Sequence, residues 1–322
     1  NSSAFGSAGL ELVNGTLDLN GNTIANTIYV SEGAVVTAKN GTTTGDFVLT
    51  NAKSYTADNF RVLADSITMT GDGKTSTASF VNLNVTDSSS TAYRGGYLGA
   101  TSVSVLGMTE LSFRNATVTK RNENIYGGLI SGTNVSLQTN SVISLTDNSI
   151  RLTDTEDIYG GLVYRSSSVN ISNNGNIKIT GNDFSSNYWI YGGVFYSGGT
   201  LRLNNNNEVC LNDNTGTTVT FDISGGVLKA STLEITGNAT LTMNGNQMTS
   251  TDTYNSNRGV YGSVLNASNI YVRNNDIVEL IGNTATSKTE VLGGAMYSSN
   301  VQVQGNGTLS ITDNKASGRR GN

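Results

Sequence analysis

The chain has 322 residues, a formal net charge of −5 and a charged fraction of 13%, about half of the usual share. It contains no histidine, which excludes Ser-His-Asp and Cys-His catalysis and removes the commonest metal ligand. No basic excess is present to attract nucleic acid, and no apolar run is long enough for a membrane span or a signal peptide.

Proline is absent from the chain, whereas glycine occurs 38 times. Since proline cannot donate a hydrogen bond to a β-ladder, its absence indicates a backbone whose N–H groups are nearly all used in sheets.

The first 92 residues alternate apolar and polar side chains without a regular period. Residues 10–22, LELVNGTLDLNGN, match residues 301–314, VQVQGNGTLSITDN, with one residue deleted. The later stretches SITMTGDG and FVNLNVTDS also alternate, which is typical of half-buried strands. We therefore expect one ordinary coil at the N-terminus and two or three irregular coils before Tyr93.

Seven regular repeats of about 32 residues fill positions 93–322. Each contains a glycine pair, replaced once by Gly262-Ser263, and the pairs recur in steps of 31 to 37 residues. They are Gly95-Gly96, Gly127-Gly128, Gly160-Gly161, Gly192-Gly193, Gly225-Gly226 and Gly293-Gly294. The longest step contains residues 249–258, which we interpret as a loop insertion.

Apolar side chains occupy five fixed positions after each glycine pair. In one repeat they are Val163, then Val169 and Ile171, then Ile177 and Ile179. The spacing of two indicates strands with one inward face, so each repeat should contain three short strands. Repeats of this kind, stacked at the strand spacing of about 4.8 Å, predict an all-β fold, a right-handed parallel β-helix. We expect nine or ten coils, which form a single domain of residues 1–322.

Each repeat closes on an asparagine, which glycine or aspartate precedes in six of the seven repeats. Both preceding residue types tolerate the positive φ of a tight turn. Because like residues stack in register along a β-helix, we expect a ladder of asparagine side chains at this corner. Its predicted members are Asn115, Asn148, Asn182, Asn214, Asn246, Asn283 and Asn314.

The glycine pairs and closing corners resemble those of the chlamydial polymorphic membrane proteins, a group of autotransporter passengers, and of kindred bacterial surface β-helices. The family motif is Gly-Gly-Ala followed by Ile, Leu or Val. GGAM at 293–296 matches it closely, whereas GGLI, GGLV and GGVF match it loosely. Phe113-Arg114-Asn115 is the one closing motif that contains phenylalanine. The resemblance implies export across an outer membrane, display on the cell surface and an adhesive role.

Tyrosines form two columns beside the glycine pairs: Tyr126, Tyr159, Tyr191 and Tyr261 before the pair, and Tyr164, Tyr196 and Tyr297 after it. They form either stacked rungs that only stabilise the coils or a flat strip that binds sugar rings or a partner surface. Tyr188 and Trp189 break the repeat in the corner DFSSNYW, so we predict them as the exposed edge of such a strip. Tyr191, Tyr164 and Tyr196 are the further predicted contacts.

No constellation of catalytic or metal-binding residues is apparent. Glu156 and Asp157 lie together in a loop, and four other carboxylates are expected at outward positions of different coils: Glu208, Asp222, Glu234 and Glu279. A glycosidase needs two carboxyl groups that flank one bond, and the calcium-binding nonapeptide and EF-hand loop do not occur. We predict no catalytic residue, metal or cofactor, and we place Cys210 on the surface.

These features predict a bacterial surface-exposed or secreted passenger domain that acts as an adhesin or stalk and contacts a protein or glycan on another cell. The alternative is a structural subunit that associates with copies of itself into a fibre, sheath or surface layer, because bare coil ends are sheet edges. A polysaccharide-degrading enzyme is a third hypothesis. We expect function where the repetition fails: in the corner after Asn182, at residues 249–258 and in the coils before Tyr93.

Overall fold

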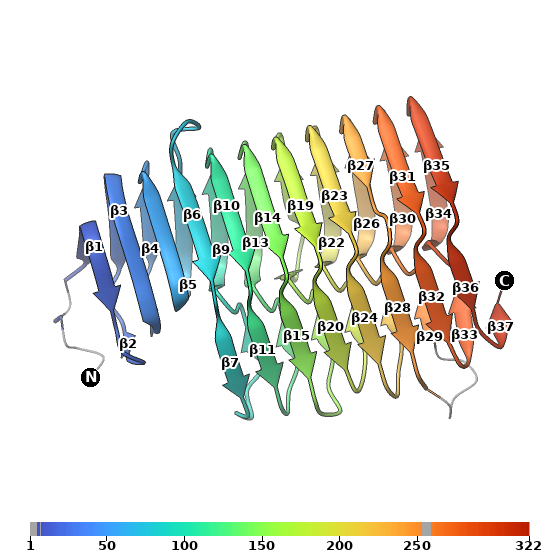
Figure 1. The fold of residues 1–322 in the computed structure, drawn as a ribbon, viewed down its shortest axis with the longest axis horizontal. Helices are drawn as coiled ribbons and strands as arrows, with labels where there is room; N and C mark the ends of the chain where they lie inside the picture. The colour runs from blue at the N-terminus through green and yellow to red at the C-terminus, as the bar shows by residue number, and fades with distance from the viewer. Residues whose placement is uncertain (1–4, 7, 253–258, 322) are drawn as a thin grey trace.

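The computed structural model describes residues 5–6, 8–252 and 259–321, which form a rod of stacked coils (Figure 1). Successive coils pair through parallel strands, and one coil follows the next after about 32 residues over most of the rod. The described residues contain no helix, and hence none that could cross a membrane. The predicted all-β parallel solenoid is confirmed.

Three parallel sheets run along the rod, one of 21 strands and two of eight strands among the described residues. Sheet A comprises β1 (Leu10–Asp18), β2 (Thr23–Ile24), β3 (Ile28–Thr43), β4 (Phe47–Thr50), β5 (Ser54–Thr70), β6 (Thr77–Val81), β9 (Leu98–Leu106), β10 (Glu110–Arg114), β13 (Ile130–Gln138), β14 (Val142–Thr146), β17 (Val163–Arg165), β18 (Val169–Ser172), β19 (Asn176–Thr180), β22 (Phe195–Asn204), β23 (Glu208–Asn212), β26 (Leu228–Thr236), β27 (Thr240–Thr242), β30 (Leu265–Arg273), β31 (Ile277–Ile281), β34 (Met296–Gln304) and β35 (Thr308–Thr312).

Sheets B and C supply the other walls of the rod. Sheet B comprises β7 (Asn84–Asp87), β11 (Thr117–Lys120), β15 (Ser149–Leu152), β20 (Asp183–Ser186), β24 (Thr215–Thr218), β28 (Gln247–Ser250), β32 (Thr284–Ser287) and β36 (Lys315–Ser317). Sheet C comprises β8 (Tyr93–Arg94), β12 (Ile125–Tyr126), β16 (Ile158–Tyr159), β21 (Ile190–Tyr191), β25 (Ile223–Ser224), β29 (Gly259–Tyr261), β33 (Glu290–Leu292) and β37 (Arg320–Gly321).

The core is a continuous column of apolar side chains inside the coils. One inward position of sheet A is filled by Val103, Val135, Val169, Leu201, Leu233 and Ile270, each at most 1% exposed. A coil cannot bury this face alone, because its inward side chains pack on those of the coils above and below. Stacking therefore creates the core.

The first coils are narrower than the rest, which corrects the expectation of an ordinary coil at the N-terminus. Leu10, Ile28, Phe47 and Ile67 pair in succession at steps of 18, 19 and 20 residues, and Ile67 then pairs with Val103 after 36 residues. Three narrow coils built from sheet A alone thus precede eight wide ones. Figure 1 shows sheet B beginning only at β7.

The change of width is made by residues 82–97, which carry the first strands of sheets B and C. In the last narrow coil, residues 54–58 lead directly to Val62; in the next coil, β7 and β8 intervene before the chain returns at Leu98, which pairs with Val62. Buried aromatic rings fill the interior at this junction, and Phe80 stacks on Phe113 at 4.6 Å between ring centroids. Large side chains occupy the extra volume that the wider coil encloses.

An asparagine ladder begins at the corner between β14 and β15 and continues at the equivalent corner of each later coil. Asn214 is typical: its Oδ1 accepts hydrogen bonds from N and Nδ2 of Asn182 at 3.3 and 2.9 Å, and its Nδ2 donates to Asn246 Oδ1 and to Ile179 O, each at 3.1 Å. The ladder runs through Asn148, Asn182, Asn214, Asn246, Asn283 and Asn314.

The placement of Asn115 in this ladder is wrong by one residue. Asn115 is exposed and has a φ of 56°, so it occupies the left-handed turn position that precedes the ladder residue. Ala116 takes the ladder position and donates its N–H to Asn148 Oδ1 at 3.0 Å. Asparagine tolerates positive φ nearly as well as glycine and aspartate do, which is why the two positions look alike in the sequence.

A second ladder, which the sequence analysis missed, lies eight residues before the first, at the corner between β9 and β10 and its equivalents. Asn140, Asn174, Asn206, Asn238, Asn275 and Asn306 are joined by the same side-chain hydrogen bonds. Both ladders keep the same steps along the chain, so the signal was present in the sequence. Two corners of every later coil are therefore held by amide networks.

Removing one ladder amide should destabilise the rod. Asn214→Ala leaves buried donors and acceptors in two neighbouring coils without partners, and we expect a loss of about 2–4 kcal/mol in the free energy of unfolding. The control is Asn176→Ala, an exposed strand asparagine whose side chain accepts one hydrogen bond from Asn207; we expect a loss below about 0.5 kcal/mol. Urea unfolding followed by circular dichroism measures both, and equal losses would contradict a stabilising ladder.

Candidate binding site

The glycine pairs form a tight outer corner between sheet C and the start of each sheet A strand. Gly127 has a φ of 67°, and a Cβ there would overlap the carbonyl oxygen of Ile130. Only glycine fits this approach of two backbones. Two side chains point outward on either side of this corner. One belongs to the residue just before the glycine pair, and the other to the residue four positions after the first glycine of the pair.

Two tyrosine columns meet at this corner. Tyr126, Tyr159 and Tyr191 stack nearly parallel, with centroids 5.2 and 4.9 Å apart, and Tyr164 stacks on Tyr196 at 5.5 Å. The columns contact each other edge to face, Tyr126 with Tyr164 at 4.8 Å and Tyr159 with Tyr196 at 5.3 Å. These five rings are half-buried, so each keeps part of its surface open to solvent.

Tyr188 and Trp189 extend the stack at the corner after Asn182. Trp189 lies parallel to Tyr191 at 5.3 Å, and Tyr188 packs on Phe221 at 3.7 Å. Both side chains are half-buried, not the fully exposed edge that the sequence analysis predicted, because Phe221 of the next coil covers one side of them. Phe221 was missed, since it lies outside the repeated positions.

We name these eight residues the aromatic strip: Tyr126, Tyr159, Tyr164, Tyr188, Trp189, Tyr191, Tyr196 and Phe221. The structure brings together all five residues predicted as ligand contacts. Tyr261 and Tyr297 contact each other at 5.6 Å but lie apart from the strip, because Ser224, Lys229 and Asn266 occupy the intervening column positions.

Asp157 connects two coils of the strip. Its carboxylate accepts hydrogen bonds from the Tyr159 hydroxyl at 3.0 Å and from the backbone N–H of Trp189 at 3.4 Å. Burial raises the pKa of Asp157 above its ordinary value, although these two hydrogen bonds oppose the effect. Burial, and then the charge of Asp157, also raises the pKa of the Tyr159 hydroxyl.

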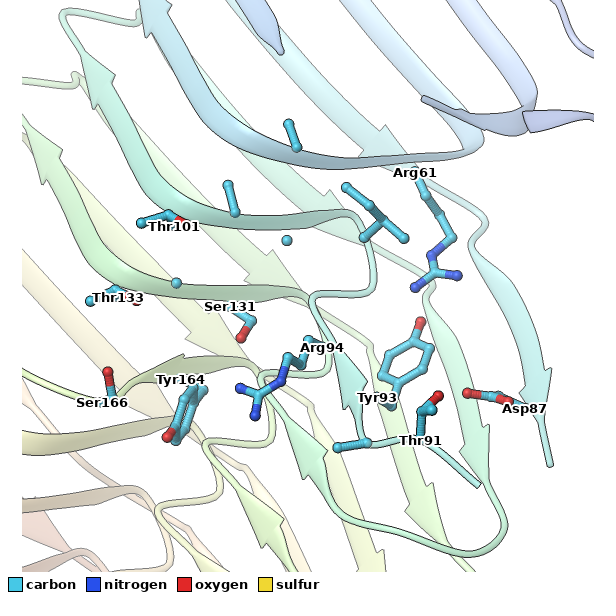
Figure 2. Close-up of a pocket in the computed structure, with 16 residues that line it drawn as sticks. Arg61, Asp87, Thr91, Tyr93, Arg94, Thr101, Ser131, Thr133, Tyr164 and Ser166 are labelled. Atoms are coloured by element: carbon cyan, nitrogen blue, oxygen red, sulfur yellow. The ribbon is translucent and has the colours of Figure 1, made fainter. Parts of the chain in front are cut away.

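An open groove of about 570 Å³ lies where the aromatic strip ends, at the junction of the narrow and wide coils (Figure 2). The column positions filled by Tyr164 and Tyr196 in later coils are held here by Ser131 and Gly99. Because these two residues have no aromatic ring, the surface is hollow at this point. We name it the junction groove; Tyr164 belongs both to its lining and to the strip.

Two arginines line the junction groove. Arg94 takes the column position of Tyr126 in the preceding coil, and its guanidinium lies 4.3 Å from the centroid of the Tyr126 ring. Arg61 comes from the last narrow coil, lies over the Tyr93 ring at 4.9 Å and donates from Nε to Gly96 O at 3.0 Å. The position of Arg94 can be found from the sequence, because it directly precedes a glycine pair. The position of Arg61 cannot, because the narrow coils do not have the period of the later repeats.

The carboxylate of Asp87, also in the groove lining, is already paired. Lys120, which is fully buried, lies 3.2 Å from Asp87 Oδ2 and donates to Ser89 O at 2.6 Å. Burial opposes the ionisation of Asp87, but hydrogen bonds from Ser89 and the charge of Lys120 outweigh it and lower the pKa of Asp87. Within the described part of the chain, neither Arg61 nor Arg94 forms an ion pair.

The other carboxylates are dispersed over the rod. Glu234 pairs with Arg202 at 2.7 Å, whereas Asp222, expected on the surface, is only 2% exposed and accepts the N–H of Gly259 at 2.5 Å. The surface assignment of Asp222 is wrong because that residue caps a backbone N–H of the next coil. No group of three or more metal-ligating side chains occurs in the described ranges. Cys210 is half-buried beside Asn212 and Thr242.

Of the places where repetition fails, residues 253–258 lie outside the described residues. The corner after Asn182 carries Tyr188 and Trp189 of the aromatic strip, and the coils before Tyr93 form one wall of the junction groove.

The fluorescence of Trp189, the one tryptophan of the chain, should report the protonation of Asp157. The folded state holds this proton more tightly than the unfolded chain does, so folding gains stability as the pH falls through the folded-state pKa. We expect a fluorescence transition centred above the ordinary aspartate value of about 4. Asp157→Asn should abolish the transition.

Glu156→Gln is the control for this titration. The pKa of Glu156 is also raised, by burial and then by the charges of Glu123 and Asp157. Its removal should leave the transition in place, and a transition that persists in Asp157→Asn would contradict the assignment.

Comparison of the chain with protein-family models, with curated proteins and with solved structures finds no match, so the strand pairing alone assigns it to the parallel β-solenoids, with no family identified.

Proposed function

We propose that this protein is a bacterial surface-exposed or secreted β-helical passenger that acts as an adhesin, with the aromatic strip as its contact surface for carbohydrate. The observation that supports the proposal is the gathering of eight half-buried aromatic rings on one corner of a rod whose charged fraction is only 13%. The glycine-pair repeats, which resemble those of autotransporter passengers, support display outside the cell.

The geometry of the strip suits sugar rings. Because the rings stack face to face within each column, the strip presents ring edges and tyrosine hydroxyl groups to solvent, and these side chains lose little conformational entropy on binding because each has two rotatable bonds. Here the rings are already held against each other, as the 4.9 Å spacing of Tyr159 and Tyr191 shows. Binding therefore needs little further ordering of the side chains.

The length of the strip suits an extended ligand. Its rings belong to successive coils, from Tyr126 through Tyr159 to Tyr191, so the surface runs along the rod. A polymer that lies along the strip can contact several coils at once. Such a rod acts both as a stalk and as a multivalent contact surface.

Truncation of the end of the strip formed by Tyr188 and Trp189 tests this function. The double variant Tyr188→Ala, Trp189→Ala removes two of the rings, and we expect at least a tenfold loss of binding to host cells or to a glycan array, as for the aromatic centres of other interfaces, where about 2 kcal/mol is lost per residue. The control is Tyr29→Ala, which removes a 46% exposed tyrosine from a narrow coil. If wild-type binding is present and both variants keep it, the strip is not the contact surface.

A further inference from the structure

We propose that the junction groove binds an acidic sugar, a hexuronate residue of a polysaccharide chain whose neighbouring residues lie along the aromatic strip. This inference depends on the proposed carbohydrate-binding function and specifies its ligand class. It is carried by the shape of the groove, by its uncompensated positive charge and by one unused buried hydroxyl.

The groove occupies the column position that tyrosine rings fill in later coils. Tyr164 stacks on Tyr196 at 5.5 Å, and in the preceding coil its column position is held by Ser131, which offers only a hydroxymethyl group, although Tyr126 of that coil contacts Tyr164 edge to face at 4.8 Å. The coil before that has Gly99 at the same position. A six-membered sugar ring placed beside Ser131 would contact Tyr164 and continue the column.

The hydroxyl groups of a sugar would also find partners in the groove. Thr101, Thr133 and Ser166 line it, one from each of three successive coils, on the side of Tyr164 and away from Arg61 and Tyr93, as Figure 2 shows. Each side-chain hydroxyl can donate one hydrogen bond and accept others. The combination of an aromatic ring and several hydroxyls in one groove suits a pyranose better than a purely apolar ligand.

The charge of the groove selects an acid. Arg61 and Arg94 form no ion pair among the described residues, whereas the carboxylate of Asp87 is neutralised by Lys120. Two guanidinium groups are thus uncompensated on a chain of net charge −5. Guanidinium matches the planar geometry of a carboxylate, with which it forms charge-assisted hydrogen bonds.

Both arginines retain donors for a ligand. Of its five N–H groups, Arg61 uses Nε on Gly96 O and one on Nη2 for Gly95 O, at 3.0 and 3.4 Å. Arg94 is exposed; its guanidinium lies 4.3 Å from the centroid of the Tyr126 ring and also interacts with the Tyr164 hydroxyl, which leaves further N–H groups for a ligand. Figure 2 shows the two guanidinium groups well separated along the groove, so they suit acidic groups on different residues of one chain.

The Tyr93 hydroxyl is a third polar group at this site. Its side chain is 3% exposed, and Oη has no hydrogen-bond partner within the described residues, a costly state for a buried hydroxyl. Burial raises the pKa of Tyr93 to about 12, so the group is a neutral donor at ordinary pH. Figure 2 shows it directed towards Arg61. A carboxylate bound by Arg61 would give it an acceptor after a small shift of the arginine.

Binding of three tetrasaccharides by the whole protein tests the inference by isothermal titration calorimetry. They are a galacturonate tetramer, its carboxyl-reduced form and a sulfated galactose tetramer. We expect the galacturonate tetramer to bind at least about tenfold more tightly than the reduced form, with an affinity that falls as salt is raised. Equal affinities for the acidic and reduced tetramers would overturn the inference, and tighter binding of the sulfated tetramer would replace hexuronate by a sulfated sugar.

Three variants locate the effect. Arg94→Gln should weaken binding of the galacturonate tetramer about tenfold and leave the reduced tetramer unaffected, whereas Arg151→Gln, which removes a charge from an exposed position of sheet B, should change neither. Thr101→Trp fills the groove from an exposed position and should abolish acidic binding; Thr133→Trp replaces it if circular dichroism shows misfolding. If Arg94→Gln binds the acid as wild type does, the groove is not the site.

These outcomes are distinct from a failure of the proposed function. If Tyr188→Ala, Trp189→Ala loses cell binding while no tetramer prefers the wild-type groove, the adhesin function stands and the acidic ligand is wrong. If acidic binding depends on Arg94 but cells are bound equally by all variants, the groove is a carbohydrate site and the strip is not the adhesive surface.

Discussion

The hydrogen-bond requirements of buried amides at two corners of each coil from Asn140 onward are the constraint on which the rest of the rod depends. Each ladder asparagine, such as Asn214 or Asn206, joins the coil before it to the coil after it through its side chain. A slip of one residue would leave these groups buried and unpaired, at a cost of about 1–3 kcal/mol for each group. The ladders therefore hold the coils in register and make equivalent residues stack.

Because the coils are aligned in register, a residue that recurs in successive repeats forms a continuous surface along the rod. Tyrosines at equivalent positions become the aromatic strip, whereas substitution of the same positions by Ser131 and Gly99 opens the junction groove. The change from narrow to wide coils then places Arg61, from outside the regular repeats, beside that opening. Features suited to binding thus arise where one column changes its residue or where the coil changes its width.

Features whose sequence signal is local and repeated were predicted correctly. Features that depend on contacts with neighbouring coils were not. Alternation of apolar residues predicted the strands, and recurrence predicted the ladder from Asn148 to Asn314. Asn115 was misplaced because asparagine suits both the turn and the ladder position, and only the pairing of Ala116 with Asn148 separates them. The second ladder had the same period but lies among many other asparagines, so it could have been found only by aligning all repeats.

Taken alone, the sequence determined the parallel solenoid, its period of about 32 residues and the recurrence of tyrosines beside several glycine pairs, because these follow from patterns that repeat along the chain. Only the tertiary structure decided that the first three coils lack two walls, that two tyrosine columns contact each other across a corner, and that Arg61 and Arg94 line one groove. The physical reason is that these features depend on which coils lie side by side and how wide each one is, and no short stretch of sequence contains that information.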